Sequence, residues 1–122
     1  MGMDAYIYRV HNRKEIEDPN FYSKCITVED KAGWDEDDMT KPAELWYARK
    51  FWGLHETIFG DDYECGEYIE IDKDTIEKML DFATHNPDYF GGFVGVESLC
   101  WILQYYDKMK SNGFILVYEA DW

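Results

Sequence analysis

The sequence predicts an α+β fold, built as a small, mostly antiparallel sheet with about three helices packed on one face. Two observations lead to this prediction. Strand-like segments lie near both ends of the chain, and segments with helical periodicity crowd the middle. The length of 122 residues is typical of one domain, so we assign residues 1–122 to a single domain.

The first predicted strand covers residues 4–10, where Ala5 and Ile7 fall on one face and Tyr6 and Tyr8 on the other. A turn signature at residues 18–20 precedes a second, short strand expected within residues 21–28. Residues 29–39 lack apolar periodicity and are expected to form a solvated loop. Two further strands are expected at residues 68–71 and 114–118.

The longest helix is predicted over residues 40–59, with Thr40 as its N-cap and Pro42 in its first turn. Apolar residues recur there at a spacing that places them in one core-facing stripe. The stripe consists of Tyr47, Phe51, Leu54 and Ile58. A second helix is expected after a cap at Asp72, and a third over about residues 97–110.

The charge balance limits the partners of this protein. There are 26 acidic residues against 12 basic ones, which gives a formal net charge of -14. Such a chain repels DNA and anionic lipid, whose binding requires clustered cationic side chains. We therefore expect no direct nucleic-acid partner and no membrane partner, but a basic protein or a nucleic-acid-binding complex. The absence of a long apolar run predicts a cytoplasmic protein.

The acidic residues are concentrated in two segments. Residues 35–38 are all acidic, and residues 61–77 contain eight carboxylates and one basic residue, Lys73. A surface of carboxylates can occupy a groove that binds the phosphates of a duplex, as in a DNA mimic, although the same residues could serve solubility alone. The predicted partner-binding residues are Asp35, Glu36, Asp37, Asp38, Asp61, Asp62, Glu64, Glu67 and Glu70.

No set of catalytic residues is recognisable, and a non-enzymatic role is favoured. The three cysteines are far apart and form no Cys-x-x-Cys pair, so we expect no zinc site, and no other metal or cofactor is predicted. An alternative is a small enzyme or a domain that binds an anion or nucleotide through the predicted helix at residues 40–59. Its candidate residues are Tyr47, Arg49, Lys50 and His55.

The stretch at residues 44–55 resembles the signature helix of a family of small uncharacterised proteins carried by bacteriophages and prophages. Tyr47, Arg49, Lys50 and His55 match that signature by position, whereas Ala48 stands where the family has a tryptophan. The two ends of the chain also look like those of the family. The resemblance implies an α+β fold and a phage or prophage origin, but no reaction.

We therefore predict a phage or prophage accessory protein that binds and inhibits a basic host protein, within a nucleic-acid-handling or defence complex of the host cytoplasm. One alternative is the enzyme or anion-binding domain described above. Another is a homo-oligomeric structural component, for instance a homodimer, for which an exposed patch of Trp34, Trp46 or Trp101 would be the indication.

Overall fold

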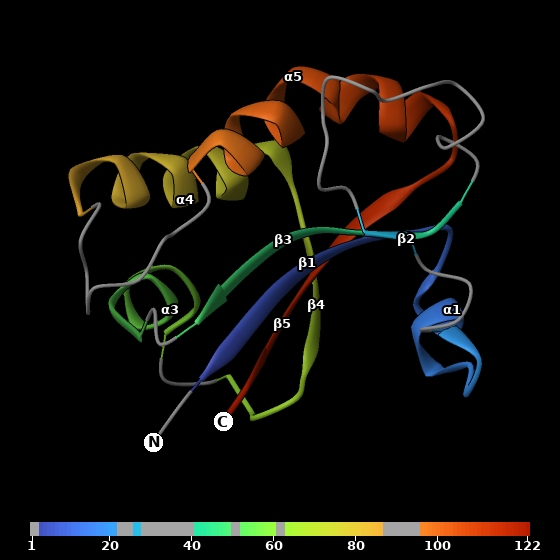
Figure 1. Ribbon diagram of the computed structural model, residues 1–122, viewed down its shortest axis with the longest axis horizontal. Coiled ribbons are helices and arrows are strands. Elements are labelled where there is room, and N and C mark those ends of the chain that lie inside the picture. Colours follow the sequence, from blue (N-terminus) through green and yellow to red (C-terminus); the bar gives the residue numbers. More distant parts are fainter. Residues whose placement is uncertain (1–2, 22–25, 28–40, 50–51, 61–62, 87–95) are drawn as a thin grey trace.

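The computed structural model describes residues 3–21, 26–27, 41–49, 52–60, 63–86 and 96–122. Strands and helices alternate irregularly along these residues (Figure 1). In chain order the elements are β1 (Asp4–Val10), α1 (Arg13–Glu17), β2 (Ile26–Thr27), β3 (Ala43–Arg49), α3 (Trp52–Phe59), β4 (Tyr68–Ile71), α4 (Lys73–His85), α5 (Val96–Ser111) and β5 (Ile115–Asp121).

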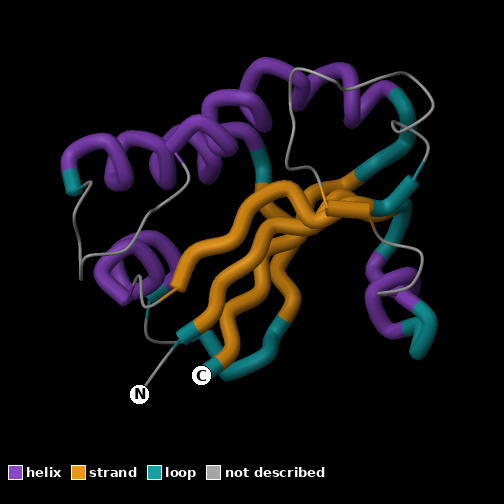
Figure 2. Tube along the Cα trace, viewed as in Figure 1, coloured by secondary structure: helices purple, strands orange, loops and turns teal. Residues whose placement is uncertain are grey.

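The five strands form one sheet in the order β2-β3-β1-β5-β4, drawn in orange in Figure 2. β1 occupies the centre and pairs antiparallel with β3 on one side and with β5 on the other, while β4 continues the sheet antiparallel to β5. The two-residue strand β2 is parallel to β3 at the opposite edge. The predicted small and mostly antiparallel sheet is thus confirmed.

The helices are distributed unequally over the two faces of the sheet. α3, α4 and α5 lie on one face, and the short helix α1 lies on the other, near the end of β1 (Figure 1). The larger hydrophobic core fills the space under the three helices, where Ile7, Leu116 and Tyr118 from the sheet meet Leu54, Ile76 and Ile102 from the helices. The prediction of about three helices on one face is confirmed.

The predicted helix over residues 40–59 is wrong in its first half. Residues Ala43–Arg49 form the strand β3, and a helix begins only at Trp52. Residues 43–49 are rich in alanine, leucine, glutamate and arginine, which favour helices in isolation. Pairing with β1 from Asp4 to Arg9 overrides that preference, because the strand buries its inner side chains and satisfies its backbone in the sheet.

A β-bulge explains why this strand escaped the sequence analysis. The register between β1 and β3 shifts at Ile7/Tyr8, so that Ile7 pairs with Trp46 but Tyr8 pairs with Glu44. Leu45 is the extra residue, and Leu45 and Trp46 are both buried. Two adjacent buried residues break the alternation that identifies a strand, and together with Ala48 they resemble a helical stripe.

The other predicted helices and strands lie close to their predicted positions. Asp72 caps α4 by accepting hydrogen bonds from the backbone amide and the hydroxyl of Thr75, both at 2.8 Å. Gly60 and Gly113 adopt φ values of 72° and 87° just after α3 and α5, where a left-handed residue ends each helix. β4 covers residues 68–71, as predicted. β5 overlaps the predicted segment 114–118 and continues to Asp121, and β2 lies within the predicted segment 21–28. The loop predicted at residues 29–39 lies outside the described residues.

The strand assignment of residues 43–49 can be tested by two substitutions on β3. Leu45 is buried, so Leu45→Ala should lower the free energy of unfolding by about 2–5 kcal/mol. Tyr47 points outward and is 45% exposed, so Tyr47→Ala should cost about 1 kcal/mol or less. Urea unfolding of both variants provides the measurement. A large loss at Tyr47 would instead support the helix, in which Tyr47 faces the core.

Candidate functional site

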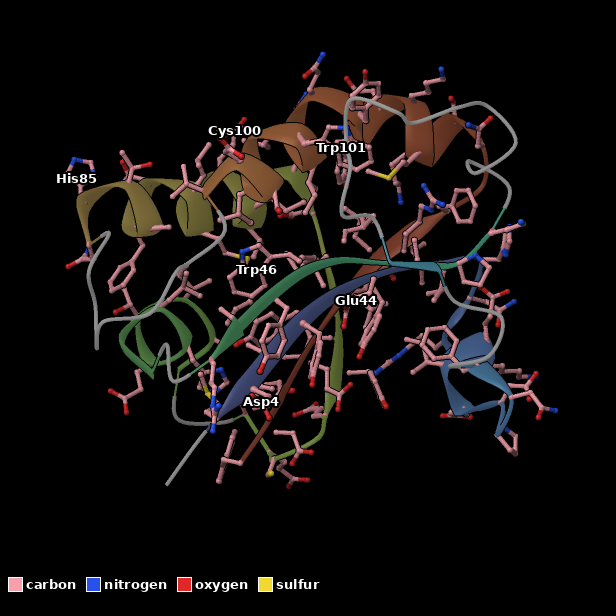
Figure 3. The ribbon with its side chains drawn as sticks, viewed as in Figure 1. Asp4, Glu44, Trp46, His85, Cys100 and Trp101 are labelled. Atoms are coloured by element: carbon pink, nitrogen blue, oxygen red, sulfur yellow. The ribbon has the colours of Figure 1, made fainter. Side chains whose placement is uncertain are left out.

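The face of the sheet opposite α3, α4 and α5 carries tyrosines and carboxylates. Strand geometry directs alternate side chains to this face. The bulge at Leu45 interrupts the alternation, so Glu44 and Trp46 lie on opposite sides of β3, with Trp46 toward the helices (Figure 3). Among the described residues, α1 and Phe21 pack over one end of this face, against Tyr8, Val10 and Val117. We call the remainder the open face. It consists of Asp4, Tyr6, Glu44, Tyr47, Arg49, Tyr68, Glu70, Glu119 and Asp121.

The middle of the open face is a row of four side chains, one from each of four adjacent strands. Tyr47 pairs with Tyr6, Tyr6 pairs with Glu119, and Glu119 pairs with Tyr68. The rings of Tyr6 and Tyr47 lie 5.2 Å apart, and the Tyr47 hydroxyl donates a hydrogen bond of 2.7 Å to Asp4. We call these four residues the tyrosine row. In this row the carboxyl group of Glu119 lies between the side chains of Tyr6 and Tyr68.

Glu119 is the unusual member of the tyrosine row. Only 7% of the residue is exposed, although it faces the side of the sheet that carries few helices. The Tyr68 hydroxyl donates a hydrogen bond to its carboxylate. The atom Oε2 is buried and has no hydrogen-bond partner among the described residues. Burial, together with the charge of Asp121, raises the pKa of Glu119 above 4.5, and the bond from Tyr68 opposes the rise.

The open face carries more acidic than basic side chains. Five of its residues carry carboxylates, and Arg49 supplies its one basic side chain. The effect is visible at Tyr6, where burial and then the charges of Asp4, Glu44 and Glu119, together with Tyr47, raise the pKa of the hydroxyl to about 12. A second cation lies beside the face, because the Arg13 guanidinium donates to the backbone carbonyl of Tyr68. Carboxylates and phenol rings together attract cationic groups, through charge and through cation–π contact.

Three of the predicted partner-binding acidic residues are described, and they lie on β4 or in the turn before it. Glu70 lies on the open face, and Glu64 and Glu67 are exposed in the turn before β4. That turn lies at the end of β5, since Gly66 donates to the carbonyl of Ala120. Further along the same acidic segment, Glu77 belongs to α4, in the layer on the other side of the sheet. Residues 35–38, 61 and 62 lie outside the described residues.

The structure separates two members of the alternative ligand-binding set. Tyr47 points to the open face, beside Tyr6. His55 belongs to α3, on the opposite side of the sheet, where it packs against Tyr118. Arg49 is exposed at the end of β3, and Lys50 lies outside the described residues. The prediction that these residues share one helix is therefore wrong, because β3 and α3 belong to different layers.

His55 is a packing residue of an aromatic cluster. It is 4% exposed, and its Nδ1 lies 2.9 Å from the hydroxyl oxygen of Tyr118. The rings of Phe59, Tyr63 and Trp122 surround it at centroid distances of 4.7 to 5.9 Å. Burial lowers the pKa of His55 below 6.5, while the charge of Glu56 acts in the opposite direction. The neutral ring therefore joins α3 to β5.

Trp46 and Trp101 are buried in the core and form no exposed patch, while Trp34 lies outside the described residues. Within the described ranges no group of three or more histidine, cysteine, aspartate or glutamate side chains could hold a metal ion. None of the helices described is long and apolar enough to cross a membrane.

Most of the open face cannot be predicted from the local sequence pattern. The pattern places Tyr6 and Tyr8 on one face of the first strand, but it does not connect them to Glu119 or Tyr68. The alternation that could have revealed the partners is present at the other end of the chain, where Glu119 and Asp121 alternate with the buried Tyr118 and Ala120.

Comparison of the chain with family models, with curated proteins and with solved structures found no match.

The raised pKa of Glu119 predicts a pH-dependent stability. Between its unfolded and folded pKa values the folded state holds more protons, so the free energy of unfolding falls as pH rises through that interval. Glu119→Gln cannot ionise. We therefore expect this variant to gain stability relative to the wild type as the pH rises from 4.5 toward neutrality. Urea unfolding of both proteins at a series of pH values measures the difference in their free energies of unfolding. If that difference is the same at every pH, the raised pKa of Glu119 is contradicted.

The bond between Tyr118 and His55 predicts a second effect on stability. Tyr118→Phe removes a buried hydroxyl, so Nδ1 of His55 loses its hydrogen bond to that hydroxyl. This loss should lower the free energy of unfolding by about 1–3 kcal/mol. Tyr47→Phe is the matched control, because its hydroxyl bonds to Asp4 at the surface and its loss should cost only about 0.5 kcal/mol. Equal losses in thermal or urea unfolding would argue against a structural role for the buried pair.

Proposed function

We propose that this protein has no catalytic role and binds a basic protein partner through the open face of its sheet. The observation that carries the proposal is the tyrosine row, which crosses four strands and is bordered by carboxylates. Tyrosine supplies large contact area with little loss of side-chain entropy, and carboxylates favour cationic partners and speed their encounter. The three helices on the other face hold the strands that present these side chains.

The charge of the open face distinguishes between two classes of partner. Aromatic side chains on an exposed sheet can stack on the bases of single-stranded RNA. Such binding also requires cationic side chains that follow the phosphates. Here five carboxylates accompany Arg49, and the protein as a whole carries a formal charge of -14. A basic protein surface therefore fits the face better than a nucleic acid does.

A narrower form of the proposal concerns the identity of the partner. The resemblance of residues 44–55 to phage and prophage proteins, the small size and the negative charge support an accessory protein that inhibits a host nucleic-acid-handling or defence complex. In that setting the open face would occupy a basic surface that otherwise holds nucleic acid.

The binding proposal can be tested with extended peptides in which arginine or lysine alternates with glycine. Calorimetry or fluorescence should detect binding to the wild-type protein that weakens with added salt. The combined variant Glu44→Gln, Glu70→Gln and Asp121→Asn removes three carboxylates from the open face. Since an exposed ion pair contributes about 0.2–1 kcal/mol, we expect affinity to fall about tenfold.

A matched control separates a binding face from general charge attraction. Glu77→Gln, Asp81→Asn and Glu97→Gln together remove the same number of charges from exposed positions on α4 and α5, the other side of the sheet. This variant should bind the peptides nearly as well as the wild type. Equal loss in both combined variants, or no binding to the wild type, contradicts the proposal.

A further inference from the structure

We propose that Glu119 is an anchor for a single arginine side chain of the partner, which enters between Tyr6 and Tyr68 and donates a hydrogen bond to Oε2. This inference rests on the proposed function and assigns a specific contact to it. Each of the two tyrosines lies directly across from Glu119, one on β1 and one on β4. The site therefore lies at the centre of the open face.

The carboxyl group of Glu119 can accept one more hydrogen bond than the described residues supply. One oxygen interacts with the Tyr68 hydroxyl, whereas the buried Oε2 has no partner among the described residues. A buried oxygen without a hydrogen bond is costly, and buried polar atoms in folded proteins are nearly always satisfied. Because Glu119 faces away from the helical layer, a donor from a second molecule can approach from the open face.

The surroundings of Glu119 favour a guanidinium group over other cations. An ammonium group is compact and strongly hydrated, so it loses more hydration when it approaches a carboxyl group that is buried, as Glu119 is. A guanidinium group is planar and more weakly hydrated, and it stacks on aromatic rings while donating in its own plane. Metal ions that prefer oxygen require several ligands, whereas Oε2 offers one.

The neighbouring residues can both attract and admit such a side chain. The titratable groups that act on or face Glu119 are Tyr6, Tyr63, Tyr68 and Asp121. None of these four groups is a cation, and the Arg13 guanidinium beside Tyr68 is bound to the backbone carbonyl of that residue. Tyr6 and Tyr68 are half-buried and flank Glu119 in the middle of the open face. Because Oε2 is buried in the free protein, entry of the guanidinium group requires the side chains around it to move.

The experiment compares the arginine–glycine and lysine–glycine peptides on the wild type and on Glu119→Gln. The wild-type protein should prefer the arginine peptide by about tenfold, which is the scale of one charge-assisted hydrogen bond. Glu119→Gln should lose that preference by weakening the arginine peptide alone. Glu70→Gln is the control, because this exposed carboxylate of the same face should weaken both peptides to a similar extent.

A second measurement uses the wild-type protein alone and does not depend on the folding of a variant. The carboxyl carbon of Glu119 can be followed by NMR while the pH is changed. Addition of the arginine peptide should lower the pKa of Glu119, because a cation beside a carboxylate favours its charged form. The lysine peptide should lower it less.

The outcomes distinguish the anchor from the wider proposal. If neither peptide binds the wild type, the proposed function fails and the anchor fails with it. If both peptides bind equally well and the pKa of Glu119 does not respond, the open face remains a cation-binding surface but the arginine anchor is wrong. A lysine preference, or a pKa that responds equally to both peptides, also overturns the choice of arginine.

Discussion

The antiparallel pairing of β1 with both β3 and β5 is the constraint on which the rest of the structure depends. In this register Asp4 lies opposite Arg49 on one side and Asp121 on the other. Since side chains alternate along each strand, this register fixes which residues meet the helices and which remain outside. A slip of one residue would place Tyr6 and Glu119 in the core and expose Ile7 and Tyr118. The core and the open face are thus set by a single choice of register.

The helical side of the sheet provides the stability that an acidic face requires. Three helices cover Ile7, Leu116 and Tyr118, and the ring of His55 links α3 to β5 through the Tyr118 hydroxyl. Neutral His55 fits this environment because burial lowers its pKa. The apolar contacts on this side offset the mutual repulsion of the carboxylates on the other. The same strands therefore carry a rigid core on one face and a charged surface on the other.

The sequence predicted the elements whose local pattern agrees with their place in the fold. α4 has an unbroken apolar stripe and a cap at Asp72, and β5 begins with a run of residues that favour strands, so both were predicted near their observed positions. β3 was missed because its bulge at Leu45 disrupts the alternation. The tyrosine row was missed for another reason: it joins positions 6, 47, 68 and 119, and only the pairing of strands brings them together. A single sequence contains no direct record of that register.

The burial of Glu119 is difficult to explain by stability alone. The chain already carries 26 acidic residues, and a carboxylate next to Asp121 with one unpaired oxygen adds repulsion and a desolvation cost. A glutamine at this position would fill similar space in the strand without the charge. In the proposed complex the same burial becomes favourable, since an ionic hydrogen bond strengthens where water is excluded. A group that destabilises the free protein and stabilises a complex is typical of a binding site, where local cost is offset by the rest of the fold.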